Sequence, residues 1–224
     1  MQTVPTTRFG MARSQATSLN FMQTTKSGQK VSKREQLLNA AMELLVDQGN
    51  MAFSMNALAR HAGASKETLY RHFGNKQGLF EAIVTENADQ AGLTADYFSA
   101  HPNNPAGFLT AFGEALLTFL MSPQSIVINR IVIAEAASNP ELALILDKHG
   151  RQRVAQSVGA QFSRYLEQGL VSSEATQSLN YFLGLLLQDS QIKVLDGSIP
   201  PLTKPDISAR AEHAAALYLK LFAC

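Results

Sequence analysis

Residues 54–76 restrict the fold of this chain more than any other part of its sequence. Ser54 is a suitable helix N-cap, because its hydroxyl can accept a hydrogen bond from a free amide of the first turn. A first helix with one apolar face follows and ends at a glycine, where the chain turns. Ser65 then caps a second helix, in which Leu69 and Phe73 lie one turn apart and face inward. Two short helices in this arrangement form a helix-turn-helix whose second helix keeps a polar face exposed.

The second helix of this pair carries a run of residues suited to contact DNA. The run TLYRHF occupies residues 68–73. Small, capping or basic residues stand at fixed offsets around it: Ala59, Gly63, Ser65, Asn75 and Lys76. In register with the helix-turn-helix, this pattern resembles the DNA-binding domain of the TetR-like family of bacterial transcriptional regulators. The resemblance implies that six residues face DNA: Ser65, Lys66, Thr68, Tyr70, His72 and Lys76.

These six residues are expected to differ in what they contact. Lys66 and Thr68 lie early enough in the second helix to reach base edges. Tyr70, His72 and Lys76 are better placed to donate hydrogen bonds to phosphates. Phosphate contacts fix the position of a protein on DNA but carry no sequence information.

This chain departs from the commoner pattern of the family at two places. Met55 and Asn56 stand where many members have a hydroxyl or a charged residue, which weakens the expectation of a phosphate anchor at the start of that helix. Glu67 would repel a nearby phosphate, and the charge of Arg71 offsets that repulsion. Neither departure indicates which operator sequence is bound.

The charge distribution places DNA binding at the amino-terminal end. The formal net charge of the chain is only +1, but residues 1–80 hold 10 Lys and Arg against 4 Asp and Glu, a net charge of +6. Residues 81–224 carry a net charge of −5. A basic segment suits a polyanionic partner and an acidic one does not.

The sequence predicts an all-α fold with an amino-terminal three-helix helix-turn-helix head joined to a larger helical ligand-binding and dimerisation domain. Residues 1–31 are predicted to be a disordered basic tail, which is either a tolerated extension or an arm that reaches a DNA groove. Residues 32–77 form the expected DNA-binding domain, whose first helix starts at a capping box of Ser32 and Glu35. Residues 78–224 form the expected effector-binding and dimerisation domain.

Helical periodicity continues through the carboxy-terminal part. A fourth helix is expected from Asn75 to about residue 97, and it joins the two domains. Five further helices are predicted at residues 105–121, 124–137, 140–170, 173–195 and 206–222, with Gly150 as a possible bend in the third. The segments RIVIAE at 130–135 and NPEL at 139–142, followed by a glycine-containing apolar helix, resemble the carboxy-terminal domain of the AefR-like branch of the same family.

Aromatic residues of this domain are candidates for a ligand pocket, because pockets in the resembling family form between its helices. The candidates are Phe108, Phe112, Phe119, Phe162, Tyr165 and Phe182. They predict a small apolar or aromatic effector, although the same spacing also suits rings that only fill the core. A dimer interface is expected on the last two long helices: Leu179, Phe182, Leu183, Leu186, Leu217 and Leu221.

Motifs of catalysis and metal binding are absent from the sequence. The five histidines include no HExxH motif and no pair at i,i+4, and no GxSxG, Walker-type or GxGxxG sequence occurs. Neither a cofactor nor a metal is therefore expected, and the protein is predicted not to be an enzyme. The single cysteine, Cys224, and the lack of a long apolar run favour a cytoplasmic protein.

Two functions from different classes fit these observations. The favoured one is a DNA-binding transcriptional regulator, expected to be a homodimeric repressor that binds an inverted-repeat operator and is released by the effector. An activator, or a regulator without a ligand, fits the same residues. The alternative class is a helical interaction or enzymatic bundle that does not bind DNA. The effector, the operator sequence and the target genes are not specified by these residues.

Overall fold

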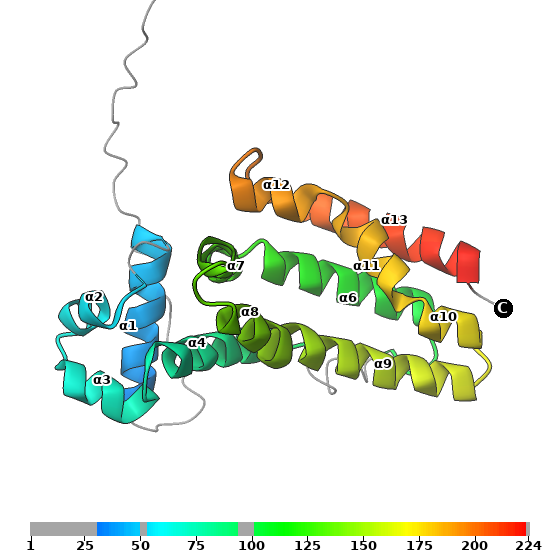
Figure 1. The fold of residues 1–224 in the computed structure, drawn as a ribbon. Helices are drawn as coiled ribbons and strands as arrows, with labels where there is room; N and C mark the ends of the chain where they lie inside the picture. Colours follow the sequence, from blue (N-terminus) through cyan, green and yellow to red (C-terminus); the bar gives the residue numbers. More distant parts are fainter. Residues whose placement is uncertain (1–30, 50–52, 94–100, 223–224) are drawn as a thin grey trace, which may run out of the picture. The chain divides into compact units, whose positions relative to one another are not determined.

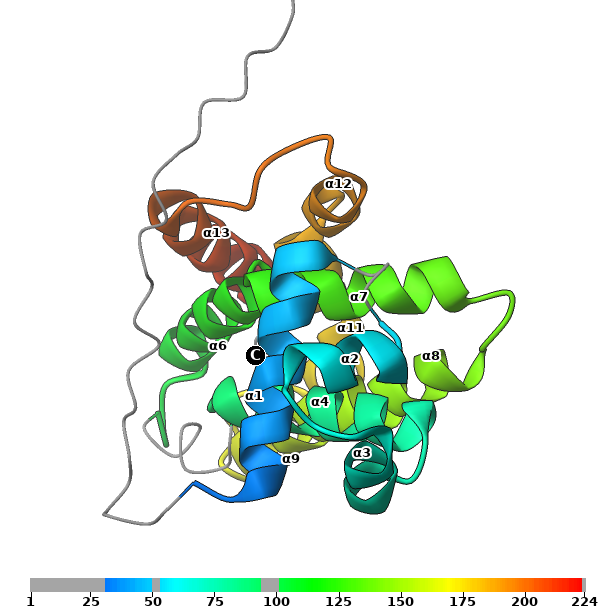
Figure 2. The same cartoon turned by 90° about the vertical axis from the view of Figure 1, so that its left-hand side faces the viewer.

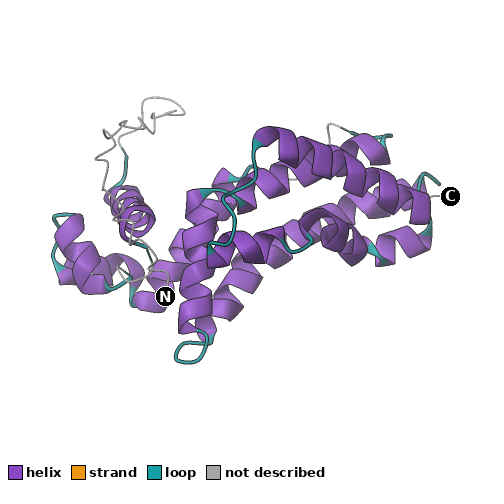
Figure 3. Cartoon of the chain, turned by 90° about the horizontal axis from the view of Figure 1, so that it is seen from above, coloured by secondary structure: helices purple, strands orange, loops and turns teal. Residues whose placement is uncertain are grey.

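The computed structural model describes residues 31–49, 53–93 and 101–222 of the chain. Every regular element in this part is a helix, which confirms the all-α fold (Figure 3). The predicted tail lies outside the described residues except for its last position. Residues 32–224 form one unit by their contacts, and the expected domain boundary between residues 77 and 78 stays a prediction.

The helix-turn-helix head consists of α1, α2 and α3 (Figure 1). Each of the three helices starts at the serine that the sequence predicts as its cap. Ser32 and Glu35 form the expected capping box, with the Ser32 amide 2.7 Å from Glu35 Oε2. The hydroxyls of Ser54 and Ser65 each accept a backbone amide three residues later at 3.2 Å. Figure 2 views this head from its own side. The bounds are α1 Lys33–Gln48, α2 Met55–His61 and α3 Lys66–Phe73.

Helix α4 (Lys76–Gln90) connects the head to the rest of the fold. Its buried residues, including Phe80 and Ile83, belong to a core that also contains side chains of α1, α2, α3, α7 and α8. The prediction that this helix reaches residue 97 is wrong, because it ends at Gln90 and the chain turns through Gly92 at a φ of 66°. Residues 94–100 lie outside the described part.

The carboxy-terminal helices enclose a second core. Helix α6 packs along α13, and Gly113 lets them approach closely, since a Cβ there would lie 3.1 Å from the Cβ of Ala211. The bounds are α6 Pro105–Leu120, α7 Pro123–Glu135, α8 Glu141–Leu146, η2 Asp147–Arg151, α9 Gln152–Glu167, α10 Ser173–Gln177, α11 Leu179–Leu187, α12 Ser190–Asp196 and α13 Lys204–Phe222.

Two of the predicted long helices are irregular. The helix expected at 140–170 contains a π-helical turn, η2, which includes Gly150. The bend expected at this glycine stays a prediction. A single helix at 173–195 is wrong, because the chain breaks into α10, α11 and α12. At the second break Gln188 has a φ of 47°, and the freed carbonyl of Leu187 accepts a hydrogen bond from the Ser190 hydroxyl at 2.6 Å. Arg210 of α13 donates to the same hydroxyl at 2.6 Å and fixes this break.

Among the described helices, none is by itself long and apolar enough to cross a membrane. Helices α6 and α7 meet the length and composition criteria only as a pair, and they bend by 66° at the break between them.

Candidate DNA-binding surface and effector cavity

Helix α3 presents the outward face that the sequence predicts. Leu69 and Phe73 are buried in the head core, whereas Tyr70 is 49% exposed. Ser65 and Lys66 are also exposed. Thr68 and His72 are half-buried on the same short helix. The structure therefore brings five of the six predicted DNA-facing residues together on α3 and its cap.

The start of α3 is fixed by a small hydrogen-bond network. The Ser65 hydroxyl accepts the Thr68 amide at 3.2 Å and lies 3.1 Å from the Thr68 hydroxyl. Hydrogen bonds from its own backbone amide and from Ser65, with the nearby charge of Lys66, lower the pKa of Glu67. Glu67 is therefore ionised at neutral pH, so Lys66 reaches outward beside a negative charge. The Ser65 and Thr68 hydroxyls thus order the start of α3 through contacts within the protein itself.

Lys76, the sixth predicted DNA-facing residue, is engaged within the chain. Its ammonium forms an ion pair with Glu135 at the end of α7 and lies 4.7 Å from the centre of the Phe53 ring. Glu135 also accepts a hydrogen bond from the Asn139 side chain at 2.8 Å. Burial alone would raise the pKa of Glu135, but the hydrogen bonds from Lys76 and Asn139 and the Lys76 charge hold it below its ordinary value. A phosphate contact of Lys76 stays a prediction, and it would compete with Glu135.

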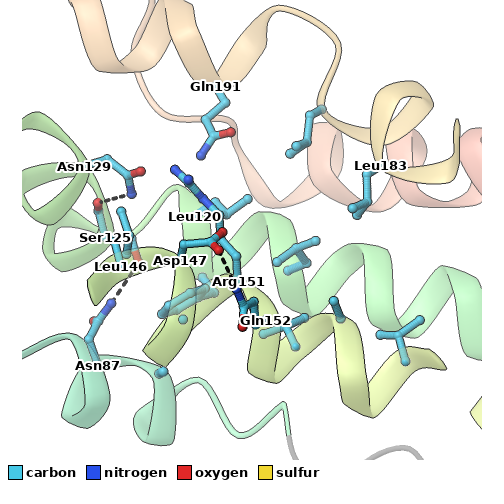
Figure 4. Close-up of a pocket in the computed structure, with 18 of the residues that line it drawn as sticks. Asn87, Leu120, Ser125, Asn129, Leu146, Asp147, Arg151, Gln152, Leu183 and Gln191 are labelled. Atoms are coloured by element: carbon cyan, nitrogen blue, oxygen red, sulfur yellow. Dashed lines mark hydrogen bonds between the residues drawn. The ribbon is translucent and has the colours of Figure 1, made fainter. Parts of the chain in front are cut away.

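A cavity of about 440 Å³ lies between α4, α6, α7, α8, η2, α9, α11 and α12 (Figure 4). Three of the six predicted aromatic residues line it: Phe112, Phe119 and Phe182. The other three, Phe108, Phe162 and Tyr165, do not line this cavity. They are buried in the core beside it, with ring centres 5.8 to 5.9 Å apart in edge-to-face contacts. These three rings therefore fill the core, which is the other interpretation of their spacing.

The polar residues of the cavity wall were missed by the sequence interpretation. Ser125 is only 2% exposed and Asn87 only 7%, although both are polar. The Asn87 amide donates to the Ser125 hydroxyl at 3.2 Å, and the Asn129 amide donates to the Ser125 backbone carbonyl at 2.8 Å. Asn87 follows Ile83 by one helical turn, so a polar residue on an apolar helix face was the available signal. Four further polar residues line the cavity near η2 and α12: Asp147, Arg151, Gln152 and Gln191.

A helix-turn-helix head with an exposed polar face on α3, followed by a helical domain with an apolar cavity, is typical of a class of two-part regulatory proteins. The comparisons with known proteins agree. Residues 37–83 match the model for bacterial regulatory proteins of the tetR family, and residues 107–224 match the AefR-like transcriptional repressor, C-terminal domain. The chain belongs to the TetR family, and both predicted resemblances are confirmed.

Individual relatives are similar to this chain over different lengths. The uncharacterized HTH-type transcriptional regulator YvkB of Bacillus subtilis is 40% identical over 58 residues, which are 26% of this chain and 31% of YvkB. The HTH-type transcriptional regulator UidR of Escherichia coli K12 is 25% identical over 149 residues, which are 65% of this chain and 72% of UidR. A TetR transcriptional regulator from Agrobacterium tumefaciens has a similar structure, with a TM-score of 0.70, 28% identity and coverage of 86% of this chain and 96% of that one.

Proposed function

We propose that this protein is a cytoplasmic homodimeric repressor that binds an inverted-repeat operator and is released from it by a small, largely apolar or aromatic molecule. The observation that carries this proposal is the position of α4. Its amino-terminal half packs in the head core, while Val84, Asn87 and Ala88 of the same helix line the cavity. A molecule in the cavity therefore contacts the helix that holds the DNA-binding head.

The homodimer belongs to this proposal, because two-fold symmetry in the protein would match an inverted repeat in the operator. Exposed apolar residues on the last helices suit such an interface: Tyr181 is 64% exposed, Ile192 57% and Leu221 67%. Two residues of the predicted interface are corrected, since Phe182 and Leu186 are fully buried in the core of the single chain. A monomeric mass by light scattering at micromolar concentration would contradict the dimer.

The DNA-binding part is tested by selecting bound sequences from a random duplex pool. Lys66→Ala should change the sequence preference, because a base contact contributes about 1–3 kcal/mol of discrimination. Tyr70→Phe should weaken binding to all sequences by about fivefold, because it removes one phosphate donor worth about 1 kcal/mol. Lys148→Ala, which removes an exposed lysine of η2, is the matched control and should bind as the wild type does. Wild-type selection and affinity in both α3 variants would contradict the proposed recognition face.

The release step is tested separately with compounds that raise the melting temperature. Near-complete release requires about 5.5 kcal/mol of preference for the conformation that does not bind DNA, and two sites of a dimer share this requirement. Compounds that stabilise the protein should therefore also dissociate the selected operator complex. If they stabilise the protein and leave the complex intact, the cavity binds ligands but the induction mechanism is wrong.

A further inference from the structure

We propose that the wall formed by Asn87, Ser125 and Asn129 recognises a hydroxyl group. The effector of the proposed function would then be an uncharged molecule with an apolar body and at least one hydroxyl that donates a hydrogen bond. This inference rests on the proposed function only for the role of the molecule as an effector. The chemistry of the site itself follows from the contacts of these three residues.

Ser125 organises the polar wall. Its hydroxyl oxygen accepts from the Asn87 side chain and its backbone carbonyl accepts from the Asn129 side chain. A carbonyl can only accept, so the Asn129 nitrogen must face Ser125 and its oxygen must face away. Figure 4 shows the Asn129 oxygen on the side opposite Ser125. Two side-chain oxygens, Oδ1 of Asn87 and Oδ1 of Asn129, have no hydrogen-bond partner among the described residues.

The two unpaired oxygens let this wall accept hydrogen bonds, and the second N–H of each amide and the Ser125 hydroxyl let it donate them. Among the described residues only Thr176 Oγ1 is a buried side-chain atom without a partner, so both oxygens are accessible and a ligand hydroxyl can donate to them in place of solvent. The same hydroxyl oxygen can in turn accept from Ser125, whose proton is not used in its contact with Asn87. A carboxylate has no proton to donate at neutral pH and would place its charge against two carbonyl oxygens. A hydroxyl can use both the acceptors and the donors of this wall, whereas a carboxylate can use only the donors, so the wall favours a hydroxyl over an acid.

Charged groups of the cavity lie on η2 rather than at this wall. Asp147 and Arg151 have opposite charges, and the Asp147 carboxylate accepts from the Gln152 side chain at 2.6 Å. Arg151 is exposed and points toward Gln191 in Figure 4. Since the two charges oppose each other, the lining gives no strong net preference for an ion.

The rest of the cavity suits the apolar body of such a molecule. Its wall is formed by rings and branched side chains that include Phe112, Leu116, Phe119, Val158, Phe182 and Leu183. The volume of about 440 Å³ lies within the range of roughly 300–1,000 Å³ that small-molecule sites occupy. A molecule with two rings and a terminal hydroxyl can bury its rings there and present the hydroxyl to Asn129.

Three matched compounds test this inference: biphenyl, 4-phenylphenol and biphenyl-4-carboxylate. Calorimetric titration of the DNA-free protein at pH 7, where the phenol keeps its proton, gives their affinities directly. The phenol should bind about tenfold more tightly than biphenyl, because it adds hydrogen bonds without adding charge. The carboxylate should bind more weakly than the phenol. Equal affinity for the phenol and biphenyl, or tightest binding of the carboxylate, would overturn the inference, the latter in favour of recognition by Arg151.

A variant locates the hydroxyl site. Asn129→Leu keeps the number and branching of the side-chain heavy atoms and removes the acceptor, so the advantage of the phenol over biphenyl should fall to about twofold or less. Val158→Ala, in the apolar wall, is the control and should weaken all three compounds alike. An unchanged advantage in Asn129→Leu would place the hydroxyl elsewhere and contradict the proposal. The ranking of compounds on the wild-type protein stands as a test even if this variant fails to fold.

These measurements separate the inference from the proposed function. The expected ranking without release of the operator would support the hydroxyl site and contradict its role in induction. If the protein binds the operator but ranks the three compounds differently, the proposed DNA-binding function is unaffected and the proposed class of ligand is wrong.

Discussion

Two buried tyrosines connect distant segments of the effector domain through their hydroxyls. Tyr165 donates to the backbone carbonyl of His101, and Tyr218 donates to that of Ala175. Burial raises the pKa of Tyr218 to about 12. Burial also raises the pKa of Tyr165, against the opposing effect of a hydrogen bond with Gln161. The folded protein thus favours the protonated form of both rings.

Tyr218 should make the stability of the protein fall at alkaline pH. Because its folded pKa lies above the ordinary value of 10.0, its contribution is complete below pH 10 and is lost as the pH rises toward 12. Tyr218→Phe should cost about 1 kcal/mol at pH 7, from the lost hydrogen bond, and should make the decline above pH 10 less steep. Urea unfolding at fixed protein concentration from pH 8 to pH 11.5 measures both effects.

The exposed Tyr181 provides the control for this comparison. Tyr181→Phe should leave the stability and its pH dependence close to those of the wild type. If Tyr218→Phe shows the same alkaline slope as the wild type, the phenol of Tyr218 is not the group that titrates on unfolding.

The junction of α3 and α4 depends on a single small residue. A Cβ added to Gly78 would lie 2.1 Å from the backbone carbonyl oxygen of Phe73, at the end of the recognition helix. Backbone cannot yield as a flexible side chain can, so Gly78→Ala should destabilise the protein by about 2–3 kcal/mol. Denaturant unfolding gives this value, and operator binding should weaken as α3 shifts.

Gly159 of α9 is the matched control, since an added Cβ there meets no atom within 4 Å. Gly159→Ala should stabilise the protein by about 0.5–1 kcal/mol through helix propensity alone. Similar destabilisation by both substitutions would show that the close approach at Gly78 is not the cause.

The elements that could be predicted from the sequence are those with local causes. The caps of α1, α2, α3 and α4 each join residues three positions apart, so their signals are complete within one turn. The early end of α4 also had a local signal in Gly92, which the sequence interpretation did not use. The break at Gln188 had none, because the Arg210 side chain that stabilises it comes from another helix.

The residues that line the cavity also could not be predicted from local sequence signals. Phe108, Phe112 and Phe119 share one helix, and periodicity alone cannot say which ring faces a cavity and which faces α9. The structure places Phe112 and Phe119 at the cavity and Phe108 against Phe162 and Tyr165. The polar wall joins Asn87 to Ser125, which are 38 residues apart, so only the packing of α4 on α7 reveals it.

The ion pair of Lys76 and Glu135 couples the DNA-binding head to α7 across the fold. If an operator phosphate competes with Glu135 for Lys76, then Glu135→Gln should raise operator affinity by about two- to fivefold, the range expected for a partly exposed pair. The salt dependence of binding should also become steeper, because a further cation is free to replace a counterion. Fluorescence anisotropy at several salt concentrations measures both quantities.

Asp89→Asn is the control for this prediction. It makes the same change in net charge, on α4 instead of α7, and breaks the 2.7 Å ion pair with Arg153. It should leave operator affinity unchanged. Equal gains from both substitutions would show a general charge effect rather than competition at Lys76.

The π-helical turn η2 also determines how this chain can diverge from its relatives. A π turn holds one residue more than the α-helical turn it replaces, and each residue rotates an α-helix by about 100°. Deleting one residue within 147–151 would therefore restore a regular helical turn and leave the faces of α8 and α9 as they are, so Val154 and Val158 would stay at the cavity. A deletion between Val154 and Val158, where the helix holds no extra residue, would instead rotate the rest of α9 by about 100° and change the lining. The η2 turn is thus the place where a relative of this protein can lose a residue and keep its ligand.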